Sequence, residues 1–283
     1  MTYLKAILLG LVQGIAEFLP ISSSGHLALF QTFFGMENME EKYMFFTVLL
    51  HFGTLISVCM VYWRDIVDMI REFFLGIAAL AGRKDTGVAP PPARRMVMLI
   101  IIATVPLFVM VFLQDAVNQL FSNSIMVSCA LLATGFILFF SDRMARGHKT
   151  AKNATVADAL IVGCGQALAV IPGLSRSGTT ISVGMMRGFD RAFAVRFSFL
   201  MSLPAVLGAN VLEIKDALAS NFPIEELPMY LVGVAVSAVV GYFAIRLVKS
   251  LSDKGKFGKF AYYCWAVGLG SLVAGIVKMM LLK

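Results

Sequence analysis

Two charged residues lie inside apolar stretches, each next to a cluster of serine and glycine residues. Glu17 precedes a run rich in Ser and Gly at positions 20–26, and Arg176 lies within a similar run. A charge at membrane depth costs at least about 2.5–3.5 kcal/mol on insertion scales, so it is interpreted first as functional. The alternative is a structural Glu17–Arg176 pair that joins two segments. Such a pair would leave the surrounding polar residues without a role.

The residues around these charges are suited to binding an oxyanion. Gln13 and Glu17 are four positions apart and therefore share one face of a helix. Each run rich in Ser and Gly leads into a new apolar segment, so hydroxyls and backbone N–H groups at a helix N-terminus would face the site. Two such ends and one arginine favour phosphate. The other predicted ligand-binding residues are Ser22, Ser24, Gly25, Ser175, Ser177, Gly178 and Thr179.

Two histidines have alternative interpretations. His26 directly follows the serines and could act as a general acid or activate a hydroxyl. It could equally be an interior histidine with satisfied hydrogen bonds. His51, in the middle of a long apolar run, is predicted to be a buried hydrogen-bonding partner.

The composition indicates where these residues reside. Of 283 residues, 59% are hydrophobic and 14% are charged, and the mean hydropathy is +0.82. Soluble domains are about 45–50% apolar with glycine counted in, and about 25% charged. The composition therefore excludes a soluble domain, a nucleic-acid-binding protein and a disordered chain, and it indicates an integral membrane protein.

Six long apolar runs are predicted to cross the membrane, each close to the about 20 residues that span a hydrocarbon core. They cover residues 43–63, 96–113, 125–141, 197–213, 229–249 and 261–282. Two shorter runs, 5–19 and 158–171, stop at a proline and are followed by a loop rich in Ser and Gly and by the short apolar pieces 26–35 and 179–189. None of these pieces is long enough to cross alone. The predicted fold is all-α, with six transmembrane helices and two re-entrant helical hairpins.

The two hairpins also resemble each other. A shift of 153 positions matches Gly10 with Gly163, Gln13 with Gln166, Ala16 with Ala169, Ser22 with Ser175, Ser24 with Ser177 and Gly25 with Gly178. Two loops that are merely rich in Ser and Gly would not keep such a register. We predict one polytopic domain over 1–283 with repeats at about 1–141 and 155–283. Because three spans separate the hairpins, the repeats have inverted topology and their tips meet near the midplane.

The basic residues predict the orientation. Of the 24 Lys and Arg residues, 18 lie in segments 64–95, 142–152, 187–196 and 246–259, which the predicted topology places on one side. The positive-inside rule makes this side cytoplasmic. The first hairpin then enters from outside, and the site is expected to open to the outer face. The net charge of +7 is a topology signal and does not indicate binding of nucleic acid.

At the site residues the sequence resembles a known enzyme family. Residues 13–26, QGIAEFLPISSSGH, and 172–180, PGLSRSGTT, are similar to the two signature regions of the undecaprenyl-diphosphate phosphatases of the bacitracin-resistance type. The resemblance spans nearly the whole chain. It implies removal of the terminal phosphate from the C55 isoprenoid diphosphate, which regenerates the carrier lipid for cell-wall synthesis and gives bacitracin resistance.

The resemblance also implies residue roles. Glu17 matches the essential acid of the E/Q-x-x-x-E motif, Ser23 the proposed nucleophile, His26 the motif histidine and Arg176 the phosphate-clamping arginine. The family depends on Mg²⁺ or Ca²⁺, which implies Glu17 as a metal ligand. Position 13 is glutamine here, where some members carry a second glutamate, so Glu17 is the only acid at the site. Whether Ser23 or a water activated by Glu17 attacks is left open.

The predicted partners are a polyprenyl diphosphate and membrane lipids, and the predicted location is the bacterial inner membrane. A homodimer is left open. The rival function is a transporter or flippase of an anionic polyprenyl lipid, because inverted repeats with broken helices are a transporter architecture. Glu17, Ser23 and His26 favour hydrolysis, since anion binding alone would not require a reactive set.

Overall fold

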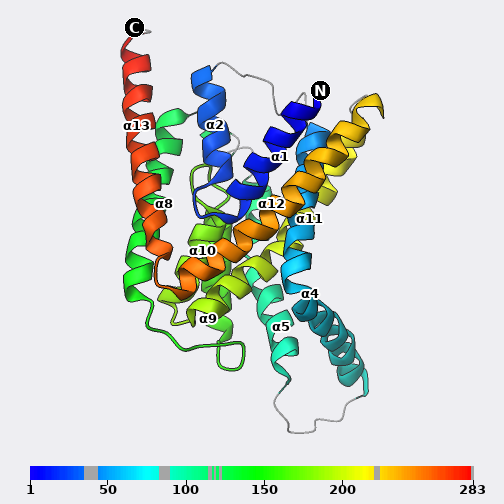
Figure 1. Cartoon of the computed structure of the whole chain (residues 1–283). Helices are drawn as coiled ribbons and strands as arrows, with labels where there is room; N and C mark the ends of the chain where they lie inside the picture. Colours follow the sequence, from blue (N-terminus) through cyan, green and yellow to red (C-terminus); the bar gives the residue numbers. More distant parts are fainter. Residues whose placement is uncertain are drawn as a thin grey trace.

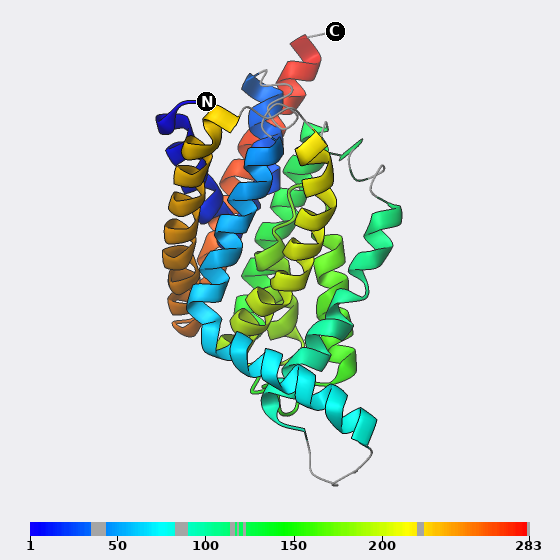
Figure 2. The same ribbon diagram turned by 90° about the vertical axis from the view of Figure 1, so that its right-hand side faces the viewer.

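The computed structural model describes residues 1–34, 44–82, 90–113, 117, 119–120, 123–219 and 224–281. Within these ranges the chain is helical, and its only β-type pairing is an isolated bridge between Lys149 and Phe189. Figures 1 and 2 show an elongated bundle in which both chain termini lie at the same end.

Six stretches are long and apolar enough to cross a bilayer, which confirms the six predicted spans. The chain is therefore a multi-pass membrane protein. The helices that form the spans are α4 (Met44–Gly82), α5 (Pro92–Thr104) followed by α6 (Leu107–Phe112), α8 (Ser124–Met144), α11 (Arg191–Ala219), α12 (Leu227–Asp253) and α13 (Phe260–Leu281).

Two of these spans differ from the prediction. The run predicted at 96–113 is interrupted between α5 and α6, where Pro106 lacks the N–H that a continuous helix would use. Helix α4 does not end at position 63 but continues to Gly82, with a kink at Tyr62 (φ −114°, ψ 25°). The charged residues after position 63 end the apolar run without ending the helix. Figure 2 shows this second part of α4 leaving the bundle at the end opposite the termini.

Within the described ranges, four further helices of more than ten residues are too short to span: α1 (Tyr3–Phe18), α2 (Ser23–Phe34), α9 (Val156–Leu168) and α10 (Arg176–Met186). The longest of them, α1, has 16 residues, or about 24 Å at about 1.5 Å per residue. In Figure 1, α1 starts at the end with the termini and α9 lies toward the opposite end, while the turns after them lie at mid-height.

The short helices form two pairs, α1 with α2 and α9 with α10. Matched glycines lie where the outer helix of each pair, α1 or α9, packs against a neighbouring span. Helix α1 packs against α12, and α9 packs against α5. A Cβ added to Gly10 would lie 2.4 Å from Gly233 O, and one added to Gly163 would lie 2.2 Å from Ala103 O. Only a residue without a side chain permits these backbone approaches. Small residues at helix contacts are typical of packing inside membranes.

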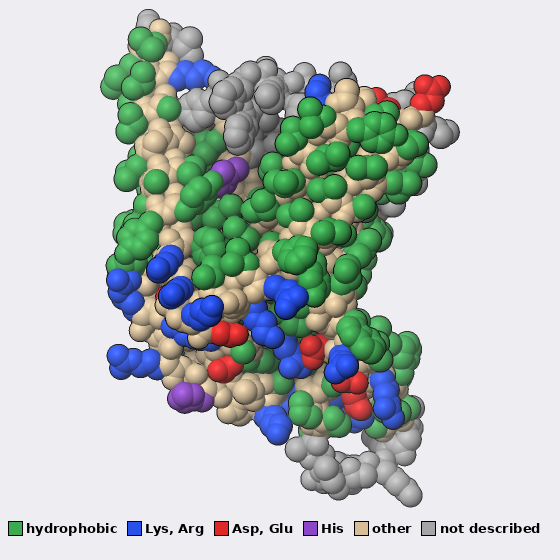
Figure 3. Space-filling model, viewed as in Figure 1, with side chains coloured by type: hydrophobic (Ala, Val, Ile, Leu, Met, Phe, Trp, Pro, Cys, Tyr) green, Lys and Arg blue, Asp and Glu red, His purple; other side chains and the backbone are tan. Residues whose placement is uncertain are grey.

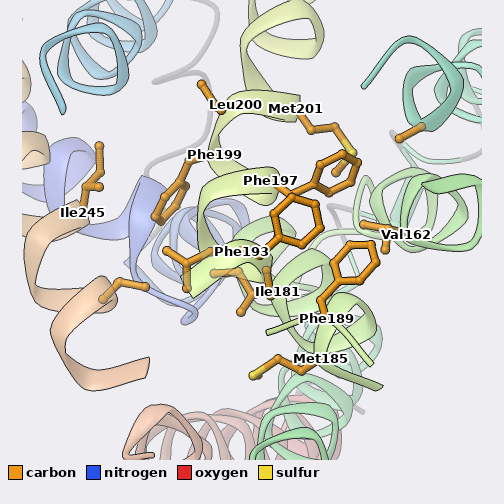
Figure 4. Packing of buried hydrophobic residues seen from close by; sticks show 14 of the residues in the cluster. Val162, Ile181, Met185, Phe189, Phe193, Phe197, Phe199, Leu200, Met201 and Ile245 are labelled. Atoms are coloured by element: carbon orange, nitrogen blue, oxygen red, sulfur yellow. The ribbon is translucent and has the colours of Figure 1, made fainter. Parts of the chain in front are cut away.

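Aromatic side chains of α11 fill the centre of the molecule next to the short helices (Figure 4). Phe197 and Phe199 are each 1% exposed. The Phe199 ring makes an edge contact with Phe18 at a centroid distance of 5.5 Å, and Phe197 makes one with Phe189 at 5.7 Å. Since lipid is as apolar as these rings, close packing rather than transfer from water stabilises this core.

Ion pairs tie the helices together at the end opposite the termini, where Figure 3 shows most Lys and Arg side chains gathered. Asp158, in the first turn of α9, is fully buried and binds Lys149 at 2.8 Å and Arg187 at 2.9 Å. It also completes a capping box with Thr155. Burial alone would raise the pKa of Asp158. Hydrogen bonds from Lys149, Thr155 and Arg187 outweigh burial and lower this pKa from 3.8 to about 2.

Candidate active site

The α1–α2 turn and the α9–α10 turn contact each other inside the bundle. A Cβ placed on Gly25 would lie 2.8 Å from Gly173 Cα, so a side chain there would overlap the opposite backbone. The Ser177 hydroxyl donates a hydrogen bond of 3.3 Å to Leu19 O across the same contact. Segments about 150 positions apart in the sequence therefore form one site.

Serine hydroxyls cap the first turns of α2 and α10, the inner helices of the two short pairs, although Ser22 has φ +65° and Ser175 has φ −75°. Ser22 Oγ accepts a hydrogen bond from Gly25 N–H at 3.2 Å, and Ser175 Oγ accepts one from Gly178 N–H at 3.1 Å. As a result α2 and α10 begin three residues before the predicted positions 26 and 179. The residues predicted as loop tips form first helical turns instead, because serine is among the strongest N-caps.

The caps determine which donors remain for a ligand. A helix leaves its first four N–H groups without intrahelical partners. The N–H groups of Gly25 and Gly178, two predicted ligands, are already used by the caps. In the described chain, no hydrogen-bond acceptor faces the backbone N–H groups of Ser23, Ser24, Arg176 and Ser177. Two helix N-termini with free donors are suited to an anion.

Neighbouring helices fix both turns. Thr134 of α8 donates its hydroxyl to Gly173 O at 2.9 Å and accepts the Ser175 N–H at 3.2 Å. Gly173 has φ +98°, a conformation that favours glycine. Cys264 of α13, fully buried, donates its thiol to Pro20 O at 3.5 Å. The turns are therefore held by side chains that sequence reasoning did not select.

Glu17 and Arg176 form an ion pair across the two turns. Glu17 Oε1 accepts a hydrogen bond from Arg176 Nη2 at 2.5 Å, and Glu17 Oε2 accepts one from Gln13 Nε2 at 3.1 Å. The two charged side chains are 9% and 22% exposed. Arg176 Nη1 is buried without a partner among the described residues. An unpaired buried donor costs about 1–3 kcal/mol, so a ligand oxygen beside Nη1 would be favoured. A purely structural pair does not account for this free donor.

A small cavity of about 50 Å³ lies between the turns. Six of the predicted site residues line it: Glu17, Ser22, Ser23, Ser24, Ser175 and Arg176. This volume exceeds the about 10–15 Å³ needed for one water and would admit a small polar group, but not an isoprenoid chain. Within the described part of the chain, the hydroxyl of Ser23 has no hydrogen-bond partner.

The other predicted residues lie around this cavity without lining it. Gln13 reaches the site through its hydrogen bond to Glu17. The Ser177 hydroxyl is turned toward Leu19 O. Thr179 Oγ1 is buried, and none of the described residues offers it a partner.

His26 lies beside the serines, and both of its ring nitrogens have partners. Nδ1 donates to Ser22 O at 2.8 Å, which leaves Nε2 to accept from the Tyr263 hydroxyl at 2.9 Å. The two rings are stacked at a centroid distance of 5.6 Å. The ring therefore makes no hydrogen bond to Ser23 in this arrangement. Tyr263 was not found from the sequence, because nothing in an apolar span marks a partner 237 positions away.

His51 of α4 is a second neighbour that sequence reasoning did not place at the site. Its Nδ1 donates to Thr47 O at 2.9 Å, so the predicted hydrogen bond is present. The predicted burial is wrong, because the His51 side chain is 32% exposed. Its Nε2 lies 4.0 Å from Glu17 Oε2. The signal that could have found it is the one that selected Glu17, a titratable residue at membrane depth.

The side chains at the cavity determine whether the protein could bind a divalent cation. Among the residues that the structure describes, no group of three or more His, Cys, Asp and Glu side chains could hold a metal. Glu17 is the one carboxylate lining the cavity, and serine hydroxyls accompany it. Mg²⁺ is commonly bound through one or two carboxylates together with phosphate oxygens of a substrate. These residues fit a cation shared with a bound diphosphate rather than one held by the protein alone.

Comparison with known proteins identifies the family. The family model described as "Bacitracin resistance protein BacA" matches residues 6–270. The chain belongs to the BacA family. Several similar proteins, including the following three, carry the name undecaprenyl-diphosphatase. The protein from Alkaliphilus metalliredigens is 43% identical over 95% of this chain and 97% of its own length. Those from Methanosphaera stadtmanae and Halothermothrix orenii are 39% and 40% identical, cover 97% and 98% of this chain, and are matched over 98% and 100% of their own lengths.

Proposed function

We propose that this protein hydrolyses undecaprenyl diphosphate to the monophosphate and inorganic phosphate. Membership of the BacA family and the names of its relatives support this reaction. One structural observation supports the same reaction at residues of this chain. The cavity between the turns combines a carboxylate with a serine hydroxyl and a buried arginine donor, neither of which has a hydrogen-bond partner among the described residues.

The proposed mechanism assigns a separate task to each group. Arg176 and the free N–H groups at the starts of α2 and α10 bind the terminal phosphoryl oxygens and stabilise their developing charge. Ser23 Oγ or a water attacks the terminal phosphorus, and the bond from phosphorus to the bridging oxygen breaks. Glu17 accepts the proton of the attacking group. The leaving group is undecaprenyl monophosphate. If Ser23 attacks, water then hydrolyses the phosphoserine.

We propose that Glu17 would hold Mg²⁺ or Ca²⁺ at the site. When bound, the cation would neutralise charge on the phosphate oxygens. The chain's own contribution is to hold the Glu17 carboxylate in place through Gln13 and Arg176.

We also propose that α1 with α2 and α9 with α10 are re-entrant hairpins of an inverted repeat in a single domain over residues 1–283. Their lengths, the matched serine caps and the matched glycine contacts support this arrangement. Because basic residues gather opposite the termini, that end is proposed to be cytoplasmic, with the site opening to the outer face of the inner membrane. A homodimer stays a prediction.

Phosphate release by the purified protein tests the function directly. Undecaprenyl diphosphate is supplied in detergent, with and without EDTA, and free phosphate is measured. We expect release that stops with EDTA and returns with Mg²⁺ or Ca²⁺. A transporter or flippase would bind the lipid and release no phosphate, and that result would overturn the proposal.

A further inference from the structure

A second cavity lies at the basic end of the bundle, away from the site between the turns. It has a volume of about 660 Å³ and is formed by α4 around its kink and by the last turns of α12. The two helices pack against each other nearer the termini and separate at this end. After the kink, Asp65 binds Arg196 of α11 at 2.5 Å, so this part of α4 is held toward α11. The kink at Tyr62 thereby opens a groove beside α12.

The groove carries an excess of positive charge. Four basic residues line it, Arg64, Arg246, Lys249 and Lys254, against the two acids Asp65 and Asp253. Asp65 is already engaged by Arg196. Within the described ranges, none of the four lining cations has a carboxylate within 4.0 Å. Cations that converge on a cavity without anionic partners favour an anionic ligand.

The groove has aromatic and apolar side chains of the kinds that are typical of the level of lipid headgroups. The Arg64 guanidinium lies 5.5 Å from the centroid of the Trp63 ring, and that of Arg246 lies 5.5 Å from the centroid of the Tyr242 ring. Trp and Tyr are typical of the boundary between membrane and water. An apolar face continues from this rim along α12 toward the other end of the bundle. On this face Val239 and Phe243 are 53% and 62% exposed.

We propose that this groove binds the phosphate of an anionic phospholipid, with the acyl chains lying on the apolar face of α12. The charged end fits the phosphate, and basic pockets between membrane helices recognise anionic headgroups. The adjoining apolar face favours a lipid over free phosphate, because inorganic phosphate would make no use of it. This site is independent of the proposed hydrolysis, since none of its residues lines the cavity between the turns.

Basic residues at this end are expected from the positive-inside rule alone, so the test needs a charge-matched control. The binding variant is Arg246→Gln with Lys249→Gln. The control is Arg146→Gln with Lys152→Gln, which removes the same charge from exposed positions at the same end but outside the groove. Native mass spectrometry of the full chain in detergent measures binding during titration with phosphatidylglycerol, phosphatidylcholine or inorganic phosphate.

We expect the wild type and the control to bind phosphatidylglycerol at least tenfold more tightly than phosphatidylcholine. The groove variant should lose at least tenfold in affinity for phosphatidylglycerol. Equal losses in the groove and control variants would show general surface attraction and overturn the proposal. So would unchanged binding by the groove variant, or displacement of the lipid by millimolar inorganic phosphate. Phosphate release from the polyprenyl diphosphate is measured in parallel. It tests the proposed hydrolysis and is not used to judge lipid binding in the groove.

Discussion

The Glu17 carboxylate lies between an arginine and an amide, and either proton transfer or cation binding can use it. Glu17→Gln keeps an oxygen for Arg176 and should preserve the fold. We expect phosphate release to fall about 10²–10⁴-fold, the usual contribution of a general acid or base. If Glu17 is a metal ligand, the Mg²⁺ concentration for half-maximal rate should also rise. If it is only a base, that concentration should stay the same.

A normal rate with normal metal dependence in Glu17→Gln would mean that this acid only pairs with Arg176. Glu72→Gln is the matched control. Glu72 also pairs with an arginine, Arg94, at 3.0 Å, but does so away from the cavity. It should keep the wild-type rate.

We propose that His26, next to the serines of the first turn, acts as a general acid at the site and that Tyr263 positions it. Tyr263→Phe keeps the stacked ring and removes the hydroxyl that His26 Nε2 accepts from. A net hydrogen bond contributes about 0.5–1.5 kcal/mol, so kcat should fall about three- to tenfold while KM changes little. Tyr262→Phe, one position away, removes a hydroxyl with no hydrogen-bond partner in the described structure and should be neutral. Equal rates in the two variants would contradict the positioning role.

The sequence predicts some residues of the site but not others. Glu17, Ser23 and Arg176 could be selected because polar groups inside apolar runs are costly and therefore conspicuous. Thr134, Cys264 and Tyr263 could not, since hydroxyls and thiols are common in membrane helices. Their contacts depend on how distant helices cross. Such crossings are set by packing and leave no local pattern in the sequence.

At the scale of elements, the buried carboxylate of Asp158 fixes the start of α9. Folding lowers its pKa from 3.8 to about 2, which contributes about 2.5 kcal/mol of stability at pH 7. This contribution is lost as the pH falls from about 4 to about 2. Asp158→Asn should therefore lower the thermal unfolding temperature at pH 7, and the difference from wild type should shrink below pH 4.

Asp68→Asn removes an exposed acid of α4 with no ion-pair partner in the described regions and serves as the control. Unfolding of both variants in detergent, followed by intrinsic fluorescence, measures the difference. An Asp158→Asn variant as stable as Asp68→Asn at pH 7 would show that the three hydrogen-bond donors of Asp158 contribute nothing net.

Element types were easier to predict than element ends. The outer helices of the short pairs were expected at 5–19 and 158–171 and occur at Tyr3–Phe18 and Val156–Leu168. The inner helices begin earlier than expected because a run rich in Ser and Gly is typical of a loop, whereas Ser22 and Ser175 act as caps. No proline or glycine lies next to Tyr62 to indicate the kink of α4. The groove that the kink opens could therefore not be predicted from the sequence.

At the scale of the whole molecule, the spanning helices could be predicted because the bilayer restricts which backbone structures can cross it. Six apolar runs of spanning length had to become helices, because unpaired backbone groups are not tolerated in lipid. The repeat was suggested by a shift of 153 positions that pairs Ser22 with Ser175 and Gly10 with Gly163. Both pairs serve matching contacts in the structure.

Membrane orientation is tested by labelling. Single cysteines replace Glu225, near the termini, and Lys256, at the basic end, in a chain whose native cysteines are replaced by serine. An impermeant thiol reagent added to whole cells should label position 225 and not 256, while both should react in opened membranes. Labelling of position 256 alone in intact cells would reverse the orientation and place the site on the cytoplasmic side.

The central claim is that the two turns form one catalytic phosphate site, and Arg176→Ala tests it most directly. This variant removes the cation whose buried Nη1 has no partner in the described part of the chain. Loss of such a group should cost roughly 3–4 kcal/mol of transition-state stabilisation, or about 10²–10³-fold in phosphate release. Arg176→Lys should restore the rate only partly, because lysine lacks the planar fork. Arg143→Ala, which removes a cation from above the Phe139 ring away from the cavity, is the control. An Arg176→Ala enzyme that keeps more than about a third of the control's rate would contradict the account.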